Sequence, residues 1–163
     1  MAYVSLLGDS IIDNKGYVNP GELSVKEHLE DQSGYVFKQL AVDGHTTKDV
    51  INYQLDSLTN LSTHNVLSIG GNDLLGHMSF LQSSLELTVV ELLEQAVGLL
   101  APIKKRYRTI VENLSQQNSN VLVCTVYEGN LMGDPYYSNV AFASKAMVSM
   151  LNDIIFTTGA TFD

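Results

Sequence analysis

The sequence predicts an α/β protein in which helices cover both faces of a parallel sheet, a three-layer α/β/α sandwich. Segments typical of strands and of helices alternate along the whole chain. The strand segments are short and almost continuously apolar, as parallel strands buried on both faces are. The 163 residues are enough to enclose one hydrophobic core, so we expect residues 1–163 to form a single domain. We expect the flavodoxin-like strand order 2-1-3-4-5.

Apolar runs that end at turn residues identify the strands. We expect strands at Tyr3 to Leu7, Tyr35 to Val42, Val66 to Ile69 and Val121 to Val126. Residues Ala160 to Asp163 are expected to open a fifth strand that the end of the sequence truncates.

Apolar residues at helical spacing predict the helices between these strands. We expect helices at Glu22 to Asp31, Lys48 to Asn60, Phe80 to Leu114 and Ala141 to Phe156. Gly98 and Pro102 interrupt the third of these patterns, which predicts either one helix with a kink or two helices in succession.

Charge and composition exclude several classes of function. Nine basic and 18 acidic residues give a net charge of -9, which disfavours nucleic acid and anionic membrane surfaces as partners. The single cysteine, Cys124, lies in an apolar run and is interpreted as a small buried hydrophobe, so we expect no cysteine-based metal site. We also expect no stretch that approaches a membrane span and, because residues 1–7 lack the features of a signal peptide, a cytoplasmic location.

Three predicted loops carry a glycine beside polar residues. Gly8-Asp9-Ser10 follows the first strand, Asp43-Gly44-His45 the second, and Gly70-Gly71-Asn72-Asp73 the third. The carboxyl ends of parallel strands lie at one edge of the sheet, where a crevice opens between strands one and three. We therefore expect these loops to converge on a site.

The residue types in these loops suit acyl transfer. Gly8 allows a sharp turn after the strand, which would leave the Ser10 hydroxyl clear of the sheet. The backbone N–H groups of Ser10 and Gly44 and the side-chain amide of Asn72 are three donors for a developing oxyanion.

These three loops together resemble the first three conserved blocks of the SGNH (GDSL-type) hydrolases. The matching segments are Gly8-Asp9-Ser10, Gly44 in a Val-Asp-Gly-His-Thr-Thr setting, and Gly70-Gly71-Asn72-Asp73 after Ser-Ile. The resemblance implies that Ser10 is the nucleophile and that Ser10 N–H, Gly44 N–H and the Asn72 side chain form the oxyanion hole. It also implies hydrolysis of a small carboxylic ester through an acyl-enzyme, with no metal and no organic cofactor.

The fourth block of that family, Asp-x-x-His after the fifth strand, has no counterpart, because no histidine follows His77. Asp163 resembles the aspartate that closes the fifth strand, but the triad role is not carried onto it. His45 and His77 follow two of the loops and are candidates for a substitute base, although surface or structural polar roles are expected for both. A serine without a base is a poor nucleophile, so we expect little activity from this chain alone.

Supporting roles are expected for other residues of the loops, Gly8, Asp9 and Gly71 among them. Asp13 is expected to hold the first turn by accepting backbone N–H bonds, and Asp73 is interpreted as a helix cap.

Further residues outside the loops have less specific interpretations. The cationic run from Lys104 to Arg108 is interpreted as a solvated helix face with Ile103 and Tyr107 turned inward. Three tyrosines near the loop after the fourth strand either line an acyl or alcohol pocket or pack the loop: Tyr127, Tyr136 and Tyr137.

Two alternatives to the esterase stay open. The chain could be a non-catalytic member of the fold that binds an acylated or carbohydrate ligand, which the missing histidine favours. A flavodoxin-type cofactor binder shares the architecture, but the first loop lacks a phosphate cradle rich in Ser and Thr. A truncated fifth strand would leave a sheet edge unprotected, so we also expect association of the chain into homo-oligomers.

Overall fold

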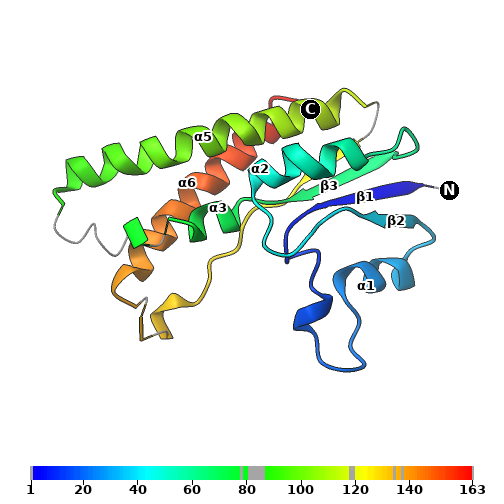
Figure 1. Ribbon diagram of the computed structural model, residues 1–163, viewed down its shortest axis with the longest axis horizontal. Coiled ribbons are helices and arrows are strands. Elements are labelled where there is room, and N and C mark those ends of the chain that lie inside the picture. Colours follow the sequence, from blue (N-terminus) through cyan, green and yellow to red (C-terminus); the bar gives the residue numbers. More distant parts are fainter. Residues whose placement is uncertain are drawn as a thin grey trace.

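The computed structural model describes residues 2–77, 79–80, 87–117, 120–133, 135–136 and 138–162. Its centre is a parallel sheet with helices on both faces (Figure 1). The strands are β1 (Tyr3–Gly8), β2 (Val36–Gln39), β3 (His64–Ser68) and β4 (Asn120–Val123). They follow the order β2-β1-β3-β4, which confirms the predicted fold class and the predicted order of these strands.

The fourth strand ends earlier than the sequence predicts, at Val123 instead of Val126. The backbone N–H of Val126 donates to Oδ1 of Asn152 at 2.7 Å, and Nδ2 of Asn152 donates back to the Val126 carbonyl at 2.8 Å. A side chain of the last helix thus takes over the hydrogen bonds that would extend the strand.

The segment expected to open a fifth strand is not a strand in the described part of the chain. The Ala160 N–H donates to the Phe156 carbonyl at 3.0 Å, and the N–H groups of Thr161 and Phe162 continue with helix-like bonds to Thr158 and Gly159. Local turns therefore use these backbone groups. Asp163 lies outside the described residues.

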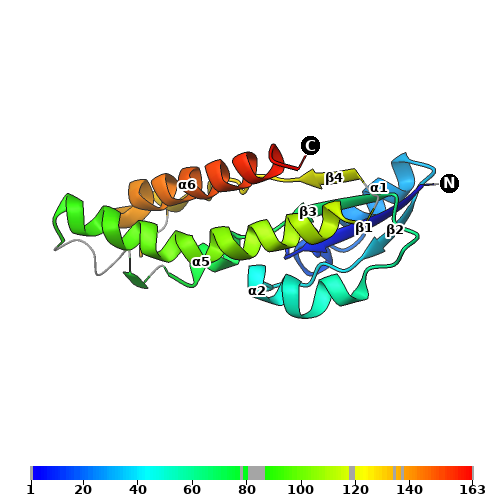
Figure 2. The ribbon, with the colours of Figure 1, turned by 90° about the horizontal axis from the view of Figure 1, so that it is seen from above.

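The helices form two unequal layers. The larger helices are α1 (Val25–Gln32), α5 (Val89–Ser115) and α6 (Ala141–Gly159), and the shorter ones α2 (Thr47–Asp49) and α3 (Gly71–Leu75). A π turn (Val50–Gln54) and a 3-10 turn (Leu55–Ser57) continue α2, and further 3-10 turns lie at Lys15–Tyr17, Leu131–Gly133 and Ser138–Val140. Figures 1 and 2 show α2, α5 and α6 over one face of the sheet and α1 on the other.

Helix α5 is one continuous helix with Pro102 inside it, so the single-helix alternative holds. It begins at Val89, later than the expected Phe80, because Thr88 caps it. The Thr88 hydroxyl accepts the Glu91 N–H, and the Glu91 carboxylate accepts the Thr88 N–H. This reciprocal capping box defines the start of the helix. The expected helical residues 81–86 lie outside the described part of the chain.

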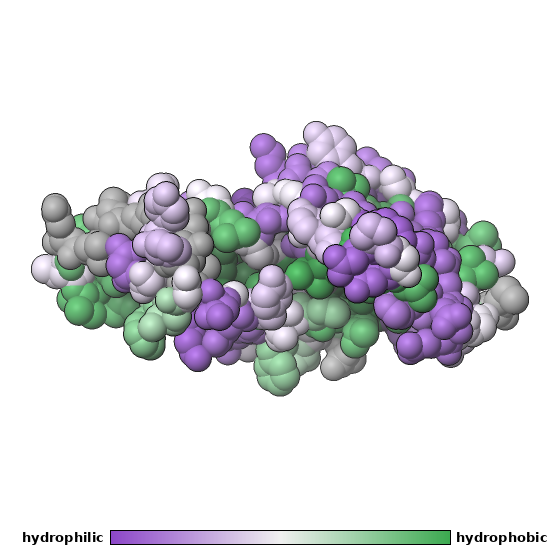
Figure 3. Space-filling view, turned by 90° about the horizontal axis from the view of Figure 1, so that it is seen from below, coloured by the Kyte–Doolittle hydropathy of each residue, from purple (hydrophilic) through white to green (hydrophobic). Residues whose placement is uncertain are grey.

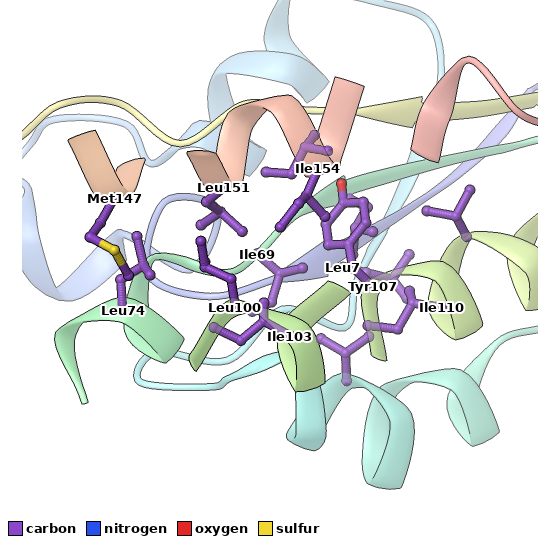
Figure 4. Packing of buried hydrophobic residues seen from close by; sticks show 14 of the residues in the cluster. Leu7, Ile69, Leu74, Leu100, Ile103, Tyr107, Ile110, Met147, Leu151 and Ile154 are labelled. Atoms are coloured by element: carbon purple, nitrogen blue, oxygen red, sulfur yellow. The ribbon is translucent and has the colours of Figure 1, made fainter. Parts of the chain in front are cut away.

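Alternation along the strands divides the apolar side chains between the two faces. Leu7 and Ile69 enter the main core, where they meet Ile103 and Tyr107 of α5 and Leu151 of α6 (Figure 4). Ile103 and Tyr107 are fully buried, which confirms that they turn inward. A smaller cluster on the opposite face contains Val4, Leu6, Ile12 and Ala41.

The second face is covered less completely than the first. Leu122 on β4 points away from the main core and is 60% exposed. In the face seen in Figure 3, polar side chains gather over the end that carries α1, and apolar ones line a hollow near the middle. Association through the β4 edge stays a prediction.

One helix is long and apolar enough to bear on the expected absence of a membrane span, which stays a prediction. Residues 138–159 form 22 helical residues, and an 18-residue stretch of them has a mean hydropathy of 1.3, long and apolar enough to cross a membrane by length and composition alone. Of that stretch 28% is buried, and Met147, Leu151 and Ile155 of the same helix belong to the main core.

A Gly8→Ala substitution should strongly destabilise the fold. Gly8 has φ 141°, and a Cβ there would lie 1.9 Å from the Ser68 carbonyl oxygen of the neighbouring strand. We expect a loss of about 4 kcal/mol or more in the free energy of unfolding, measured by urea denaturation. Gly98→Ala is the matched control, because a Cβ at Gly98 meets nothing within 4 Å and should stabilise α5 by about 1 kcal/mol. Equal stability of the two variants would contradict the close approach.

Candidate active site

The turn after β1 presents Ser10 at the carboxyl edge of the sheet. The Asp9 carbonyl accepts the N–H groups of Ile12 at 3.1 Å and Asp13 at 2.9 Å, while Asp9 Oδ1 accepts the Ile11 N–H at 3.1 Å. These bonds close a tight turn with Ser10 half-buried within it. The turn-holding role expected of Asp13 thus belongs to Asp9, whose side chain lies close enough to reach the N–H two residues ahead.

Asp13 instead links the first loop to the second. Its Oδ2 accepts the Asp43 N–H at 3.0 Å, and its Oδ1 accepts Nε2 of Gln39 at 2.8 Å. Asp13 does accept a backbone N–H, as expected, but from the second loop and not from its own turn.

Asn72 links the second loop to the third. Its Nδ2 donates to the backbone carbonyl of His45 at 2.9 Å. Gly44, immediately before His45, is exposed and has φ 79°, a left-handed conformation that glycine adopts without strain. The three loops therefore form one hydrogen-bonded group at the edge of the sheet, as the sequence predicts.

The candidate oxyanion donors are available in this arrangement. Within the described part of the chain, neither the backbone N–H nor the hydroxyl of Ser10 makes a hydrogen bond, and the Gly44 N–H makes none. The Asn72 amide uses one of its two hydrogens on His45. Two backbone N–H groups and one amide hydrogen thus have no protein acceptor among the described residues.

Gln54 is a site-supporting residue that the sequence reasoning missed. It is 2% exposed; its Oε1 accepts the Gly8 N–H at 2.8 Å, and its Nε2 donates to the Gly8 carbonyl at 2.8 Å. Nε2 also lies 2.9 Å from His45 Nδ1. The sequence pattern could have predicted its burial, because Gln54 lies four residues after Val50, on the apolar side of a helical pattern.

The Gln54 contacts define the protonation of the His45 ring. Because the Gly8 N–H can only donate, the amide atom facing it is the oxygen, and the nitrogen faces His45. The His45 Nδ1 must then accept, which leaves the proton on Nε2. His45 in this tautomer has no free lone pair for the proton of a serine. No hydrogen bond joins His45 or His77 to Ser10 in the residues described.

Asp73 is not a helix cap, which corrects the sequence interpretation. It is the third residue of α3, and the residue at the N-cap is Gly70 with φ 118°. Its carboxylate is buried and accepts the Thr47 N–H at 2.8 Å and the Thr47 hydroxyl at 2.6 Å. Nη2 of Arg106 lies 3.1 Å from Asp73 Oδ1, and Nε of Arg106 donates to the Thr47 hydroxyl at 2.7 Å.

Arg106 therefore does not lie on a solvated helix face, as was expected for the basic run, because its side chain bonds buried groups. The ion pair and the Thr47 bond join α5 to the start of α2 and to the third loop. The spacing of charges along one helix cannot reveal a carboxylate 33 residues away in the chain.

Asp9 carries an unfavourable buried charge. It is 4% exposed, and burial raises the pKa of its carboxyl, with Asp73 and Asp43 adding repulsion and the Ile11 N–H opposing both.

A pocket of about 440 Å³ opens beside the third loop, with Gly71, His77 and Tyr127 among its lining residues. Tyr127 lines this pocket, Tyr136 is 78% exposed, and Tyr137 lies outside the described residues. Across the described residues, no group of three His, Cys, Asp or Glu side chains could hold a metal ion.

A Gln54→Leu substitution should destabilise the protein by about 3 kcal/mol, because it leaves both backbone groups of Gly8 and the His45 Nδ1 without their partner. Urea denaturation measures this loss. Gln95→Leu, at an exposed position of α5, should change stability by less than about 0.5 kcal/mol. If both variants unfold at the same urea concentration, the Gln54 contacts do not stabilise the loop.

An Asp9→Asn substitution should raise the Tm at neutral pH. A folded-state pKa above the unfolded value of 3.8 means that Asp9 stabilises the fold when protonated and loses this contribution as pH rises through the folded pKa. Asparagine keeps an oxygen for the Ile11 N–H without the charge. The gain should shrink as the pH falls towards 3.8, in Tm measurements from pH 4 to 8. Asp31→Asn, at an exposed position, should show no such trend, and a lower Tm for Asp9→Asn at pH 7 would refute the assignment.

Comparison with known proteins finds similarity in structure only. No protein-family model and no curated protein sequence matches the chain. The chain superposes on an acetyl xylan esterase, AlAXEase, with a TM-score of 0.67 and 21% identity over 98% of this chain and 73% of that one. For a phospholipase A1 from Streptomyces albidoflavus NA297, the TM-score is 0.59 at 20% identity, over 99% and 76% of the two chains.

A third solved structure extends the pattern. The esterase EstA from Pseudoalteromonas sp., inhibited by monoethylphosphonate, gives a TM-score of 0.56 at 19% identity over 94% of this chain and 75% of that one. Similarity at these identities is evidence for the fold. Together with the parallel sheet in the order β2-β1-β3-β4, it shows that this chain has the SGNH/GDSL hydrolase fold.

Proposed function

We propose that the chain hydrolyses a carboxylic ester with Ser10 as the nucleophile. The observation that carries the proposal is the set of unused donors at the edge of the sheet. The Ser10 and Gly44 N–H groups and one Asn72 amide hydrogen have no acceptor among the described residues, and the Ser10 hydroxyl also has no partner there. Unused donors on the three loops at one edge of the sheet suit a charge that exists only in the transition state.

In the proposed reaction, the Ser10 oxygen attacks the ester carbonyl and loses its proton to a base. The carbonyl oxygen becomes an oxyanion, which the three donors stabilise. The alcohol then leaves, and water hydrolyses the acyl-serine. Loss of one oxyanion donor typically lowers turnover by ~10²–10³. Asn72 is the donor most accessible to substitution, because it donates through its side chain, whereas Ser10 and Gly44 donate through the backbone.

The general base in this proposal is a histidine that the given sequence does not include, as the family resemblance implies. The contact between His45 Nδ1 and Gln54 supports this, because it occupies the lone pair that would accept the serine proton. Hydrolysis by this chain alone should accordingly be slow.

A non-catalytic binder of an acylated or carbohydrate ligand is the second candidate. The surroundings of Ser10 favour this candidate, since no histidine ring is hydrogen-bonded to Ser10 in the described residues. The two candidates differ in whether Ser10 reacts.

A reactive phosphonate should label Ser10, and added imidazole should accelerate the labelling. A small external base can replace one that the chain lacks, whereas a binding protein has no reason to stabilise the negative oxygen on phosphorus. The measurement is intact-mass analysis over time with ethyl p-nitrophenyl methylphosphonate, followed by peptide mapping.

Ser10→Ala should abolish this labelling, and Ser57→Ala, at an exposed position, should leave it unchanged. Asn72→Ala should slow it by about 10²-fold through loss of one donor. Labelling that is equally fast in the Ser10→Ala variant, or absent from the wild type with imidazole present, would favour the binding protein.

A further inference from the structure

We propose that protonation of His45 releases the second loop from the end of β1, so that the site loses the alignment of two oxyanion donors as the pH falls. This inference rests on the proposed function and names a regulation of the same site. The His45 ring is half-buried, and its Nδ1 lies 2.9 Å from Nε2 of the buried Gln54. A ring with one edge towards water can leave such a partner without opening the core.

The Gln54 amide cannot adapt to a protonated ring. Its Oε1 accepts the Gly8 N–H at 2.8 Å, and its Nε2 donates to the Gly8 carbonyl at 2.8 Å. Turning the amide over would place nitrogen against the N–H and oxygen against the carbonyl, so Nε2 has to face the ring. A His45 ring with protons on both nitrogens would then present an N–H to an N–H. The ring must turn away from Gln54 before its Nδ1–H can reach an acceptor.

Charges around the ring favour its protonation, in opposition to Gln54. The carboxylate that acts on it directly is Asp49 of α2: bonds from Thr46 lower the pKa of Asp49, and positive charges on His45 and Lys48 lower it further. Other charged or titratable side chains on the surrounding elements are Asp9, Asp43, Tyr53, Asp73 and the Arg106 that pairs with Asp73. Carboxylates outnumber cations among these described residues, so their field favours an imidazolium. Histidine ordinarily changes charge between pH 5 and 8, where the two opposing influences can balance.

Movement of His45 would reach two of the three donors. Gly44 has no packing of its own, since a Cβ there would meet nothing within 4 Å. Its neighbours hold it: the Asp43 N–H donates to Asp13 Oδ2 at 3.0 Å, and the His45 carbonyl accepts Nδ2 of Asn72 at 2.9 Å. His45 thus bonds the end of β1 through its ring and the third loop through its backbone. When the ring turns away, the Gly44 N–H and the Asn72 amide both lose the residue that aligns them.

His45→Asn tests the switch, because asparagine keeps an acceptor near the position of Nδ1 but does not titrate. The measurement is the rate of Ser10 labelling by ethyl p-nitrophenyl methylphosphonate from pH 5 to 8, with a fixed concentration of imidazole. Protonation of imidazole itself slows both proteins equally, so the ratio of variant to wild type isolates His45. We expect this ratio to rise about tenfold from pH 8 to pH 5, since only the wild type gains a charge on residue 45. His28→Asn, at an exposed position of α1, should give a ratio that does not change with pH.

Nuclear magnetic resonance separates this inference from the proposed function, because it needs no reactive serine. In the wild type and in Ser10→Ala, the amide signal of Gly44 should shift with pH at the same midpoint as the ring nitrogens of His45. In His45→Asn the shift should be absent. A coupled titration without any labelling of Ser10 would support the switch and remove the ester assignment.

Two results would overturn the switch. One is a labelling ratio for His45→Asn that stays constant from pH 5 to 8. The other is a Gly44 amide in the wild type that does not follow the titration of His45. The second measurement needs no variant, so it decides the matter even where His45→Asn fails to fold.

Discussion

The buried amide of Gln54 holds the end of β1 against the second loop, and the geometry of the whole candidate site depends on it. It bonds both backbone groups of Gly8 and reaches the ring of His45, so one side chain determines where the Ser10 turn begins and how the Gly44 loop is oriented. Both N–H hydrogens of the Gln54 amide and one of the two lone pairs on its oxygen form hydrogen bonds there. A buried group so fully used has few alternative positions, which favours a rigid rather than an adaptable site.

Carboxylates dominate the edge of the sheet, and each is stabilised differently. Asp13 accepts a backbone and an amide donor, and Asp73 combines Thr47 with the guanidinium of Arg106. Asp9 has only a backbone donor, together with the repulsion of its neighbours, and burial raises its pKa. The negative potential of this edge would oppose an oxyanion at long range, which makes directly aligned N–H donors more important for the proposed chemistry. It would also stabilise a positively charged imidazole arriving beside Ser10.

The sequence predicts the fold and the convergence of the three loops well because both follow from local patterns. Apolar runs ending at glycine give the strands and their shared edge, and the segments around Ser10, Gly44 and Asn72 indicate the site. It fails where a distant side chain decides the outcome. Asn152 ends β4 before Val126, and Thr47 and Arg106 draw Asp73 away from a capping role. The burial of Gln54 likewise depends on the position of β1, which the helical spacing of residues around Gln54 does not reveal.

The unequal coverage of the two sheet faces has a consequence for how the molecule opens. The strand β3 lies between β1 and β4 and under α5 and α6, while β2 is an outer strand whose helical cover, α1, contributes no buried residue. Opening a peripheral unit requires less free energy than opening the packed centre. Amide hydrogens of β2 and α1 should therefore exchange with deuterium well before those of β3. A transient separation of β2 and α1 from the sheet would break the hydrogen bond between Asp43 and Asp13 while the Asn72 loop stayed in place. Local opening of the fold should therefore displace the Gly44 loop before the other two loops of the site.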